Sequence, residues 1–490
     1  KISKSGEVFA TVTEADGMYQ PVYEVQGLAG ATYEIKAAED VYTLDGTLRY
    51  SAGEVVDTVT TGENGVAESK PLYLGKYEIY ETEAPFGMVI NTEVHSAELV
   101  YAGQEVEITE TAASFCNDRQ KVQISLTKVM EQNKQFGIGM NNEMSAVTFG
   151  LYAGEELTAK DGKVIPADGL VEIISFNENG KAKAKSDLPF GKYYLKEIST
   201  DQHYILTDEK FSVSFEYAGQ TVDVVDIKAN DGKSISNELI YGEVHGMKKD
   251  DKGNALAGAT IGLFYTEGKE PVMTVISGED GTFSFNNIPY GEYVVREIEA
   301  PEAYVMDETP YTVNIDKNGA VVEIEITNKL IHGNVQLTKV DKDYPDHHLS
   351  GATFEVYQGD KLIGTMEELA DGVYEMDNLE YGEYYLKETK APEGFYLDEG
   401  TYTFFIKENG KTVIVENEAG HGFINKAQVG DIRIEKTSED GVLKGFTFRV
   451  EGSDITGNAF SKEYVTDENG QIHITGFRVG DYVISEVGNK

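Results

Sequence analysis

The sequence is poor in the residues that usually cross-link a long chain internally or attach it to a membrane or cell wall. Its 490 residues include one cysteine, Cys116, so no disulfide can form within the chain. No apolar run is long enough to span a bilayer, and neither a signal peptide nor a Leu-Pro-x-Thr-Gly sorting signal is visible. Secreted proteins of this size often depend on disulfides, so we expect either an intracellular chain or a different internal staple.

Positive charge is scarce as well. The chain has 42 Lys and Arg against 85 Asp and Glu, a formal net charge of −43. Nucleic-acid binding needs clustered basic residues, and docking on an anionic membrane surface needs them too, so both functions are disfavoured. The acidity is spread along the chain, which indicates solubility; a charge-selected partner is the alternative.

Tryptophan is absent and helical periodicity is almost absent, whereas the chain has 51 Gly, 30 Tyr and 21 Phe. Apolar and polar residues alternate with period two between turns of Gly, Asn and Asp, which indicates many short strands. The length suits three to five domains. We therefore predict an all-β fold of tandem antiparallel β-sandwich domains.

One phrase recurs five times: an apolar residue, two further residues, Gly–x–Tyr, and a glutamate four residues after the tyrosine. The copies begin at Leu72, Leu188, Ile288, Leu379 and Phe477. A turn glycine precedes each copy, at Gly65, Gly180, Gly281, Gly372 and Gly470. A second phrase, of the type LAGATYEI, begins at Leu28, Ser145, Leu256, Leu349 and Leu443. The distance between successive copies of each phrase matches the length of a whole domain.

The joints are marked by an asparagine that precedes a lysine by eleven residues. The pairs are Asn117 and Lys128, Asn237 and Lys248, Asn328 and Lys339, and Asn425 and Lys436. They predict domains at 1–119, 120–241, 242–331, 332–427 and 428–490. The joints hold no Pro- or Ser-rich tract, so we expect semi-rigid stacking into an elongated rod.

Three polar residues fall on the core-facing side of their strands. In the second domain Ile124 and Leu126 share one face, and Lys128 is the next residue on it. The glutamates and asparagines show the same parity, as in Tyr193, Leu195 and Glu197. Because side chains two apart point the same way along a strand, Lys, Glu and Asn should all face the core.

Buried charges must pair or react, and burial favours the neutral forms of an amine and a carboxylic acid. A neutral lysine beside a carboxylic acid and a carboxamide can attack the Asn carbonyl carbon while the acid shuttles protons to the leaving ammonia. The product would be an uncharged amide. An inert buried Lys–Glu salt bridge, with Asn as a hydrogen-bond partner, is the alternative.

The Gly–x–Tyr–x–x–x–Glu–x–x–Ala-Pro phrase, the preceding turn, the first-strand Lys and the last-strand Asn together resemble Cna B-type repeat domains, the SpaA-like domains of Gram-positive pilins and adhesins. The resemblance covers the whole chain in five copies. It implies a prealbumin-like (Ig-like) sandwich and self-catalysed Lys–Asn isopeptide bonds. Carried over to this sequence, it implies Lys128–Asn237 with Glu197, Lys248–Asn328 with Glu297, and Lys339–Asn425 with Glu388.

The two end copies and the second depart from the pattern. The second lacks Ala-Pro after Glu197, so its following loop should differ. The first has Glu81 and Asn117, but part of its first strand is missing; matching Lys1–Gly6 to Lys248–Gly253 favours Lys1 over Lys4 as its lysine. The fifth has Lys436 and Glu486 but no closing strand, so we expect an incomplete domain.

These features predict a structural stalk on the outside of a Gram-positive bacterium, anchored to the cell wall through segments outside this chain, with single-turnover self-reaction as its only catalysis. A ligand-binding adhesin region is the alternative, because the first two domains carry insertions at Ala37–Thr61, Met130–Met144 and Glu155–Glu172. Its partner would be a host protein or glycan.

No cofactor or metal site is expected. His347 and His348 lie in a polar loop, and the nearby Asp341, Asp343 and Asp346 favour a solvated loop over a calcium site. Cys116 has the opposite parity to Asn117, which indicates an inert thiol.

Overall fold

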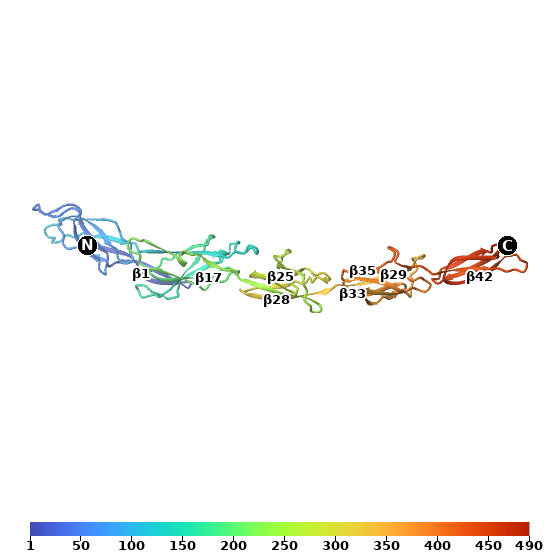
Figure 1. Ribbon diagram of the computed structural model, residues 1–490. Coiled ribbons are helices and arrows are strands. Elements are labelled where there is room, and N and C mark those ends of the chain that lie inside the picture. The colour runs from blue at the N-terminus through green and yellow to red at the C-terminus, as the bar shows by residue number, and fades with distance from the viewer. Residues whose placement is uncertain (490) are drawn as a thin grey trace. The chain divides into compact units, whose positions relative to one another are not determined.

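The computed structural model describes residues 1–489, and nearly all of its regular structure is β-strand (Figure 1). The only helical segments in that range are two short 3₁₀ turns, η1 (Glu143–Ala146) and η2 (Ala229–Gly232). The strands form separate small sheets in tandem along the sequence. The predicted all-β sandwich class is therefore confirmed. By contacts the chain divides into two compact units, residues 1–243 with 286–292 and 314–321, and the remaining described residues.

The first sandwich contains the four-stranded sheet β6-β3-β8-β9 and a second sheet, β10-β1-β2, in which β7 also pairs with β1. A small hairpin, β4-β5, lies outside them. Its strands are β1 (Ile2–Ala15), β2 (Met18–Gly27), β3 (Thr32–Ala37), β4 (Val41–Tyr42), β5 (Leu48–Tyr50), β6 (Val55–Thr60), β7 (Val66–Ala67), β8 (Gly75–Glu83), β9 (His95–Leu99) and β10 (Ala113–Asn117).

The second sandwich pairs the sheet β15-β12-β17-β18 with a sheet built on β11, which carries β16 on one edge and β19 and β20 on the other. Its strands are β11 (Lys121–Met130), β12 (Thr148–Ala153), β13 (Leu157–Thr158), β14 (Val164–Ile165), β15 (Leu170–Ser175), β16 (Lys181–Lys183), β17 (Gly191–Ser199), β18 (Lys210–Phe215), β19 (Val224–Lys228) and β20 (Ile235–Asn237).

The third sandwich contains the sheets β24-β21-β28-β26 and β23-β22-β25-β27. Its strands are β21 (Tyr241–Asp250), β22 (Thr260–Tyr265), β23 (Met273–Ile276), β24 (Thr282–Pro289), β25 (Gly291–Glu299), β26 (Tyr304–Val305), β27 (Tyr311–Ile315) and β28 (Ala320–Leu330).

The fourth sandwich contains the sheet β31-β30-β34-β35 and the sheet β32-β33-β29-β36, in which β37 also pairs with β29. Its strands are β29 (His332–Asp341), β30 (Thr353–Gln358), β31 (Lys361–Thr365), β32 (Glu367–Ala370), β33 (Val373–Glu380), β34 (Gly382–Lys390), β35 (Tyr402–Ile406), β36 (Thr412–Ile414) and β37 (Phe423–Asn425).

The C-terminal sandwich is smaller. It contains β40-β39-β42 and, within the described residues, a sheet of only two strands, β38-β41. Its buried core is correspondingly small, with Val450, Ile472 and Ile474 at its centre. Its strands are β38 (Val429–Glu435), β39 (Phe446–Asp454), β40 (Ala459–Val465), β41 (Gln471–Arg478) and β42 (Gly480–Asn489).

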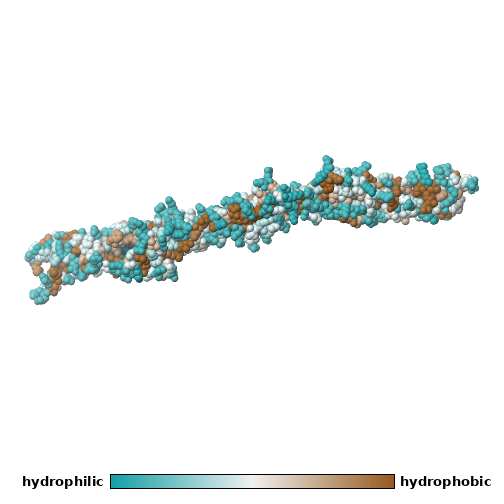
Figure 2. All heavy atoms as spheres, turned by 90° about the horizontal axis from the view of Figure 1, so that it is seen from below, coloured by the Kyte–Doolittle hydropathy of each residue, from teal (hydrophilic) through white to brown (hydrophobic). Residues whose placement is uncertain are grey.

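Strand alternation produces the cores. Along β29 every second residue is buried, from Gly333 through Val335 and Leu337 to Lys339. The side chains between these residues of β29 face outward. Figure 2 shows that hydrophilic residues cover much of one face of the molecule, with hydrophobic patches between them. The predicted parity of the core-facing lysine therefore follows directly from the pleat.

A long hairpin, β1-β2, was missed in the sequence. It turns at Asp16 and Gly17, both with positive φ, which suits a two-residue hairpin turn. Its far end packs on the second sandwich, where Val12 belongs to the hydrophobic core. The signal was present: an Asp-Gly dipeptide flanked by alternating apolar residues is a strong hairpin indicator.

The inserted segment Glu155–Glu172 of the second sandwich lies against this hairpin. It forms the small sheet β13-β14, and its backbone amides at Lys160 and Asp161 donate to the carbonyls of Phe9 and Ala10, at 3.0 and 3.1 Å. The insertion thus joins the first two sandwiches to each other.

Candidate cross-linking sites

The second sandwich brings its predicted lysine, glutamate and asparagine into one buried cluster. Lys128 Nζ lies 3.2 Å from Glu197 Oε1 and contacts Asn237 Oδ1, and the side chains of Lys128 and Glu197 have no exposed surface. The Asn237 amide donates to Glu197 Oε1 at 2.8 Å. The three groups come from β11, β17 and β20, so the cluster joins the first strand, a central strand and the last strand.

The third sandwich repeats this geometry. Lys248 Nζ lies 3.1 Å from Glu297 Oε1 and contacts Asn328 Oδ1, again with both charged side chains fully buried. The Asn328 amide donates to the two oxygens of Glu297 at 2.9 and 3.0 Å.

In the first sandwich the lysine is Lys4, and the prediction of Lys1 was wrong. Lys4 Nζ lies 2.8 Å from Glu81 Oε1 and contacts Asn117 Oδ1, whose amide donates to Glu81 at 3.0 Å. Lys1 is exposed, and its backbone ammonium donates to Thr111 O. The prediction relied on the five-residue spacing from Lys1 to Gly6, which does not carry over because the β1-β2 hairpin is inserted there. The alternation of Ile2 and Lys4 along the strand indicates Lys4 as the buried residue.

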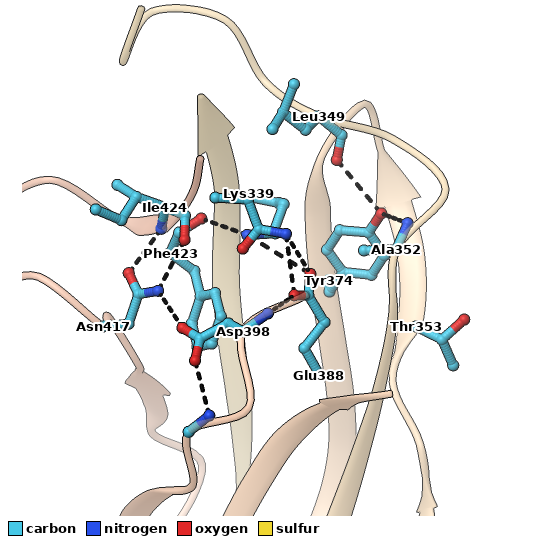
Figure 3. Close-up of polar contacts among 12 residues, drawn as sticks. Lys339, Leu349, Ala352, Thr353, Tyr374, Glu388, Asp398, Asn417, Phe423 and Ile424 are labelled. Carbon is cyan, nitrogen blue, oxygen red and sulfur yellow. Dashed lines mark hydrogen bonds and ion pairs between the residues drawn. The ribbon is translucent and has the colours of Figure 1, made fainter. Parts of the chain in front are cut away.

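The fourth sandwich holds the same groups in a different arrangement (Figure 3). Lys339 Nζ lies 3.6 Å from Glu388 Oε1 and donates to the Phe423 carbonyl at 3.1 Å. The Asn425 amide donates to both oxygens of Glu388 at 3.0 Å. Within the described chain nothing donates to Asn425 Oδ1. The carboxamide is therefore held by the glutamate while the amine is held by the backbone.

The turn glycine explains how the sequence fixes each lysine. The lysine N–H donates to the carbonyl of that glycine, as from Lys128 to Gly180 at 2.7 Å. Gly180 has a φ of +69°, and a Cβ there would lie 2.1 Å from Lys128 O. Any side chain would push the turn away from the lysine strand, so glycine is required. The same bond occurs at Lys4, Lys248, Lys339 and Lys436.

Each glutamate sits at a β-bulge. The pairing register shifts just after Glu197, between its partner Phe149 and Thr148, and the same shift occurs at Glu81, Glu297, Glu388 and Glu486. A bulge twists the strand locally and re-aims a side chain.

A backbone amide ten residues later holds the second oxygen of four of these glutamates. Asp398 N donates to Glu388 Oε2 at 2.9 Å, and the equivalent donors are Asn91, Thr207 and Asp307. In each case the donor's own side chain accepts from the backbone two residues on, which closes a tight turn. Sequence reasoning missed this position, although a short polar residue recurs there.

In the fourth sandwich Asn417 grips the strand that carries Asn425. Its carboxamide accepts from Ile424 N at 2.7 Å and donates to Ile424 O at 2.8 Å, and it also donates to Asp398 at 2.6 Å (Figure 3). Burial opposes ionisation of Asp398, but hydrogen bonds from Asn417, Gly400 and Tyr402 and the charge of Lys339 outweigh it and lower its pKa. This contact was also missed in the sequence.

Burial depresses the pKa of all four lysines. Desolvation is the largest cause for Lys4, Lys128 and Lys248, and the adjacent glutamate opposes it. For Lys339 desolvation lowers the pKa from 10.5 to about 8. At pH 7 about one such amine in ten is neutral, against roughly one in three thousand at the ordinary value. At all four sites burial thus shifts the lysine towards its neutral form, which is the nucleophilic one.

The C-terminal sandwich lacks part of this cluster in the described residues. Lys436 Nζ pairs with Glu486 Oε2 at 2.9 Å, but the two side chains are 22% and 39% exposed. Hence the lysine and glutamate positions recur, without the burial seen in the other four.

Two further residues can be placed. Cys116 is exposed on β10. The Asp341 carboxylate pairs with Arg478, whose guanidinium also lies 3.4 Å from Asp454. Asp341 therefore serves an ion pair between the fourth and fifth sandwiches.

The five tandem sandwiches make this a protein built of prealbumin-like domains. The chain belongs to the SpaA prealbumin-like fold domain family, which matches residues 22–112, 124–230, 242–330, 333–419 and 430–489. The resemblance seen in the sequence is confirmed. No helix in residues 1–489 has the length and apolar character to cross a membrane.

Several curated proteins are similar to this chain. Colossin-A of Dictyostelium discoideum is 21% identical over 485 residues, covering 89% of this chain and 4% of Colossin-A. Serine-aspartate repeat-containing protein D of Staphylococcus aureus (strain MSSA476) is 20% identical over 515 residues, covering 91% of this chain and 36% of that protein. The chain thus spans a minor part of the length of these relatives.

Two solved structures are among those similar to this chain. The Bacillus anthracis TIE protein is 20% identical, with 85% of this chain and 73% of that one covered and a TM-score of 0.45. The major pilin subunit BcpA of Bacillus cereus is 17% identical, with 67% and 98% covered and a TM-score of 0.31.

Replacing Asn417 tests whether its hydrogen bonds to Ile424 stabilise β37. In a Glu388→Ala background, which removes the carboxylate beside Lys339 and Asn425, Asn417→Ala leaves the Ile424 backbone groups without their side-chain partner. We expect the free energy of unfolding of the fourth sandwich to fall by about 1–3 kcal/mol, measured by denaturant titration. Glu418→Ala, an exposed neighbour, is the control and should change it by less than about 0.5 kcal/mol. Equal effects of the two variants would contradict the assignment.

Proposed function

We propose that this chain is a stalk segment of a Gram-positive surface protein, in which four sandwiches each lock themselves with a Lys–Asn isopeptide bond. The bonds are Lys4–Asn117, Lys128–Asn237, Lys248–Asn328 and Lys339–Asn425. The observation that carries the proposal is the fourfold recurrence of Lys and Glu with no exposed side-chain surface, each beside a buried Asn.

The reaction balances within each cluster. The neutral lysine Nζ bonds to the asparagine Cγ, the Cγ–Nδ2 bond breaks, and ammonia leaves. The glutamate, hydrogen-bonded to the amide nitrogen, takes the proton released by the amine and delivers it to the leaving nitrogen. Each glutamate is used once, so this is single-turnover chemistry rather than substrate turnover.

Strand pairing supports a load-bearing role. The lysine and asparagine strands run parallel and adjacent, with Lys339 opposite Phe423 and Asp341 opposite Asn425. A pull on the two ends of a sandwich would act on the amide between these strands and leave the strands enclosed by it unstressed. Closing a loop of 80 to 113 residues also removes unfolded-chain entropy worth roughly 4.5 kcal/mol, by analogy with a disulfide.

We also propose that the domains stack into a semi-rigid rod, with joints near residues 119, 241, 331 and 427. The packing of the β1-β2 hairpin on the second sandwich supports a stiff first joint, since Val12 lies in the core of that sandwich. A cell-surface location and attachment to the cell wall through other segments follow from the same assignment.

Intact mass under denaturing conditions tests the bonds. We expect the purified chain to weigh about 68 Da less than its sequence, because four ammonia molecules are lost. Glu81→Ala, Glu197→Ala, Glu297→Ala and Glu388→Ala should each restore about 17 Da.

Matched lysine variants sharpen this test. Lys4→Arg should restore about 17 Da, whereas Lys1→Arg and Lys436→Arg should leave the deficit unchanged. A mass equal to that of the sequence would show an inert salt-bridged core and would remove the cross-linking function.

The fourth sandwich should cross-link with a distinct pH dependence. Because the pKa of Lys339 is about 8, the rate should rise about tenfold per pH unit up to that value and then level off. The unreacted sandwich should also gain stability between pH 8 and 10.5, since the unfolded chain binds more protons there. Freshly translated chain, quenched at intervals and digested, gives the rate; a rate independent of pH from 6 to 8 would contradict the assignment.

Ligand binding by the opening domains is the second candidate function. The first sandwich has a cavity of about 740 Å³ lined by Tyr73, Tyr77, Leu99, Tyr101 and Ile108. The predicted binding insertion Glu155–Glu172 contacts the hairpin, so the cavity is the better site. A fragment of residues 1–241 should then bind a host protein or glycan in a pull-down, whereas residues 242–427 should not; equal retention would exclude this function.

A further inference from the structure

The carboxamide of the second sandwich has a partner that the other three lack. Asn237 Nδ2 donates to Thr200 Oγ1 at 2.8 Å as well as to Glu197 Oε1 at 2.8 Å. Both hydrogens of the amide are thus directed at separate acceptors, and Asn237 is 2% exposed. The nitrogen that they hold is the one that leaves in the proposed reaction.

Thr200 occupies a position that is alanine in the other three sandwiches with a buried cluster. It lies three residues after Glu197, where those sandwiches have Ala84, Ala300 and Ala391. In the third and fourth sandwiches the asparagine amide instead donates to both oxygens of the glutamate. The missing Ala-Pro of the second copy therefore corresponds to a change in how the leaving group is held.

We propose that Thr200 is an additional catalytic residue of the second sandwich, which holds the leaving nitrogen of Asn237 during isopeptide formation. The inference rests on the proposed cross-linking function. Because one N–H of the Asn237 amide donates to Thr200 Oγ1, the amide nitrogen cannot rotate away from Glu197 while Lys128 attacks.

The atoms balance as in the other sandwiches. Lys128 Nζ bonds to Asn237 Cγ, and that carbon becomes tetrahedral. Its nitrogen regains a lone pair and, still hydrogen-bonded to Thr200, stays beside the Glu197 carboxyl. Glu197 takes a proton from the attacking amine and delivers it to this nitrogen, the Cγ–Nδ2 bond breaks and ammonia leaves. Thr200 keeps its own proton throughout and acts by orientation.

A hydroxyl-specific series of variants tests the proposal. Thr200→Val keeps the shape of the side chain without the hydroxyl, and Thr200→Ser keeps the hydroxyl. The full chain is synthesised in a cell-free system and quenched into denaturant at intervals. After digestion, the peptide pair joined through Lys128 and Asn237 is identified by its mass, and its amount at each time gives the rate for this sandwich alone. The rates at the other three sites serve as internal controls.

We expect Thr200→Val to slow the Lys128–Asn237 bond by about tenfold, Thr200→Ser to restore most of the rate, and the other sites to be unaffected. Rescue by serine separates orientation of the leaving group from packing. Hydrogen exchange of β12 and β17 in the two variants checks that the sandwich folds equally in both.

The failures are distinguishable. An unchanged rate in Thr200→Val, with all four bonds formed, overturns the role of Thr200 and leaves the stalk intact. Equal slowing by valine and serine also overturns it. Absence of ammonia loss at every site overturns the cross-linking function itself.

Discussion

A lysine amine enclosed in a β-sandwich core is the constraint on which the rest of each of the first four domains depends. An isolated ammonium there would cost several kcal/mol, and a paired one still leaves a desolvated ion pair. The turn glycine, the bulged glutamate and the asparagine strand are all placed with respect to this one group. Conversion to an amide, as proposed, would remove both the charge and the penalty, so the burial that makes the lysine costly would also favour that reaction.

The four buried clusters share their parts but differ in how the carboxamide is held. Lys4, Lys128 and Lys248 contact the asparagine oxygen, whereas Lys339 donates to the Phe423 carbonyl. In the fourth sandwich Asn417 bonds to the backbone of the asparagine strand and to Asp398, and in the second Thr200 accepts a hydrogen bond from the amide itself. The conserved geometry thus belongs to the lysine and glutamate, and local substitutions adjust the third partner.

The sequence predicted the fold class and most of the site because both follow from strand parity. Lys128, Glu197 and Asn237 lie on alternating patterns that can be counted directly. Lys1 was chosen wrongly because a spacing was used in place of parity, and the inserted hairpin altered the spacing. The Asn417 and Thr200 contacts could not be predicted, since they depend on loop paths that bring residues 7 and 37 positions from Ile424 and Asn237 back against them.

The fifth sandwich differs from the other four in the burial of its lysine and glutamate. Its lysine N–H bonds to the turn glycine and its glutamate follows the same bulge, yet Lys436 and Glu486 remain 22% and 39% exposed. In the described residues β38 pairs only with β41, whereas the lysine strands β1, β11 and β29 each also carry a parallel strand that bears asparagine. Burial of the lysine therefore accompanies the asparagine strand, which in the proposed reaction would also supply the electrophile. In that reaction the amine would become nucleophilic only once its partner strand is in place.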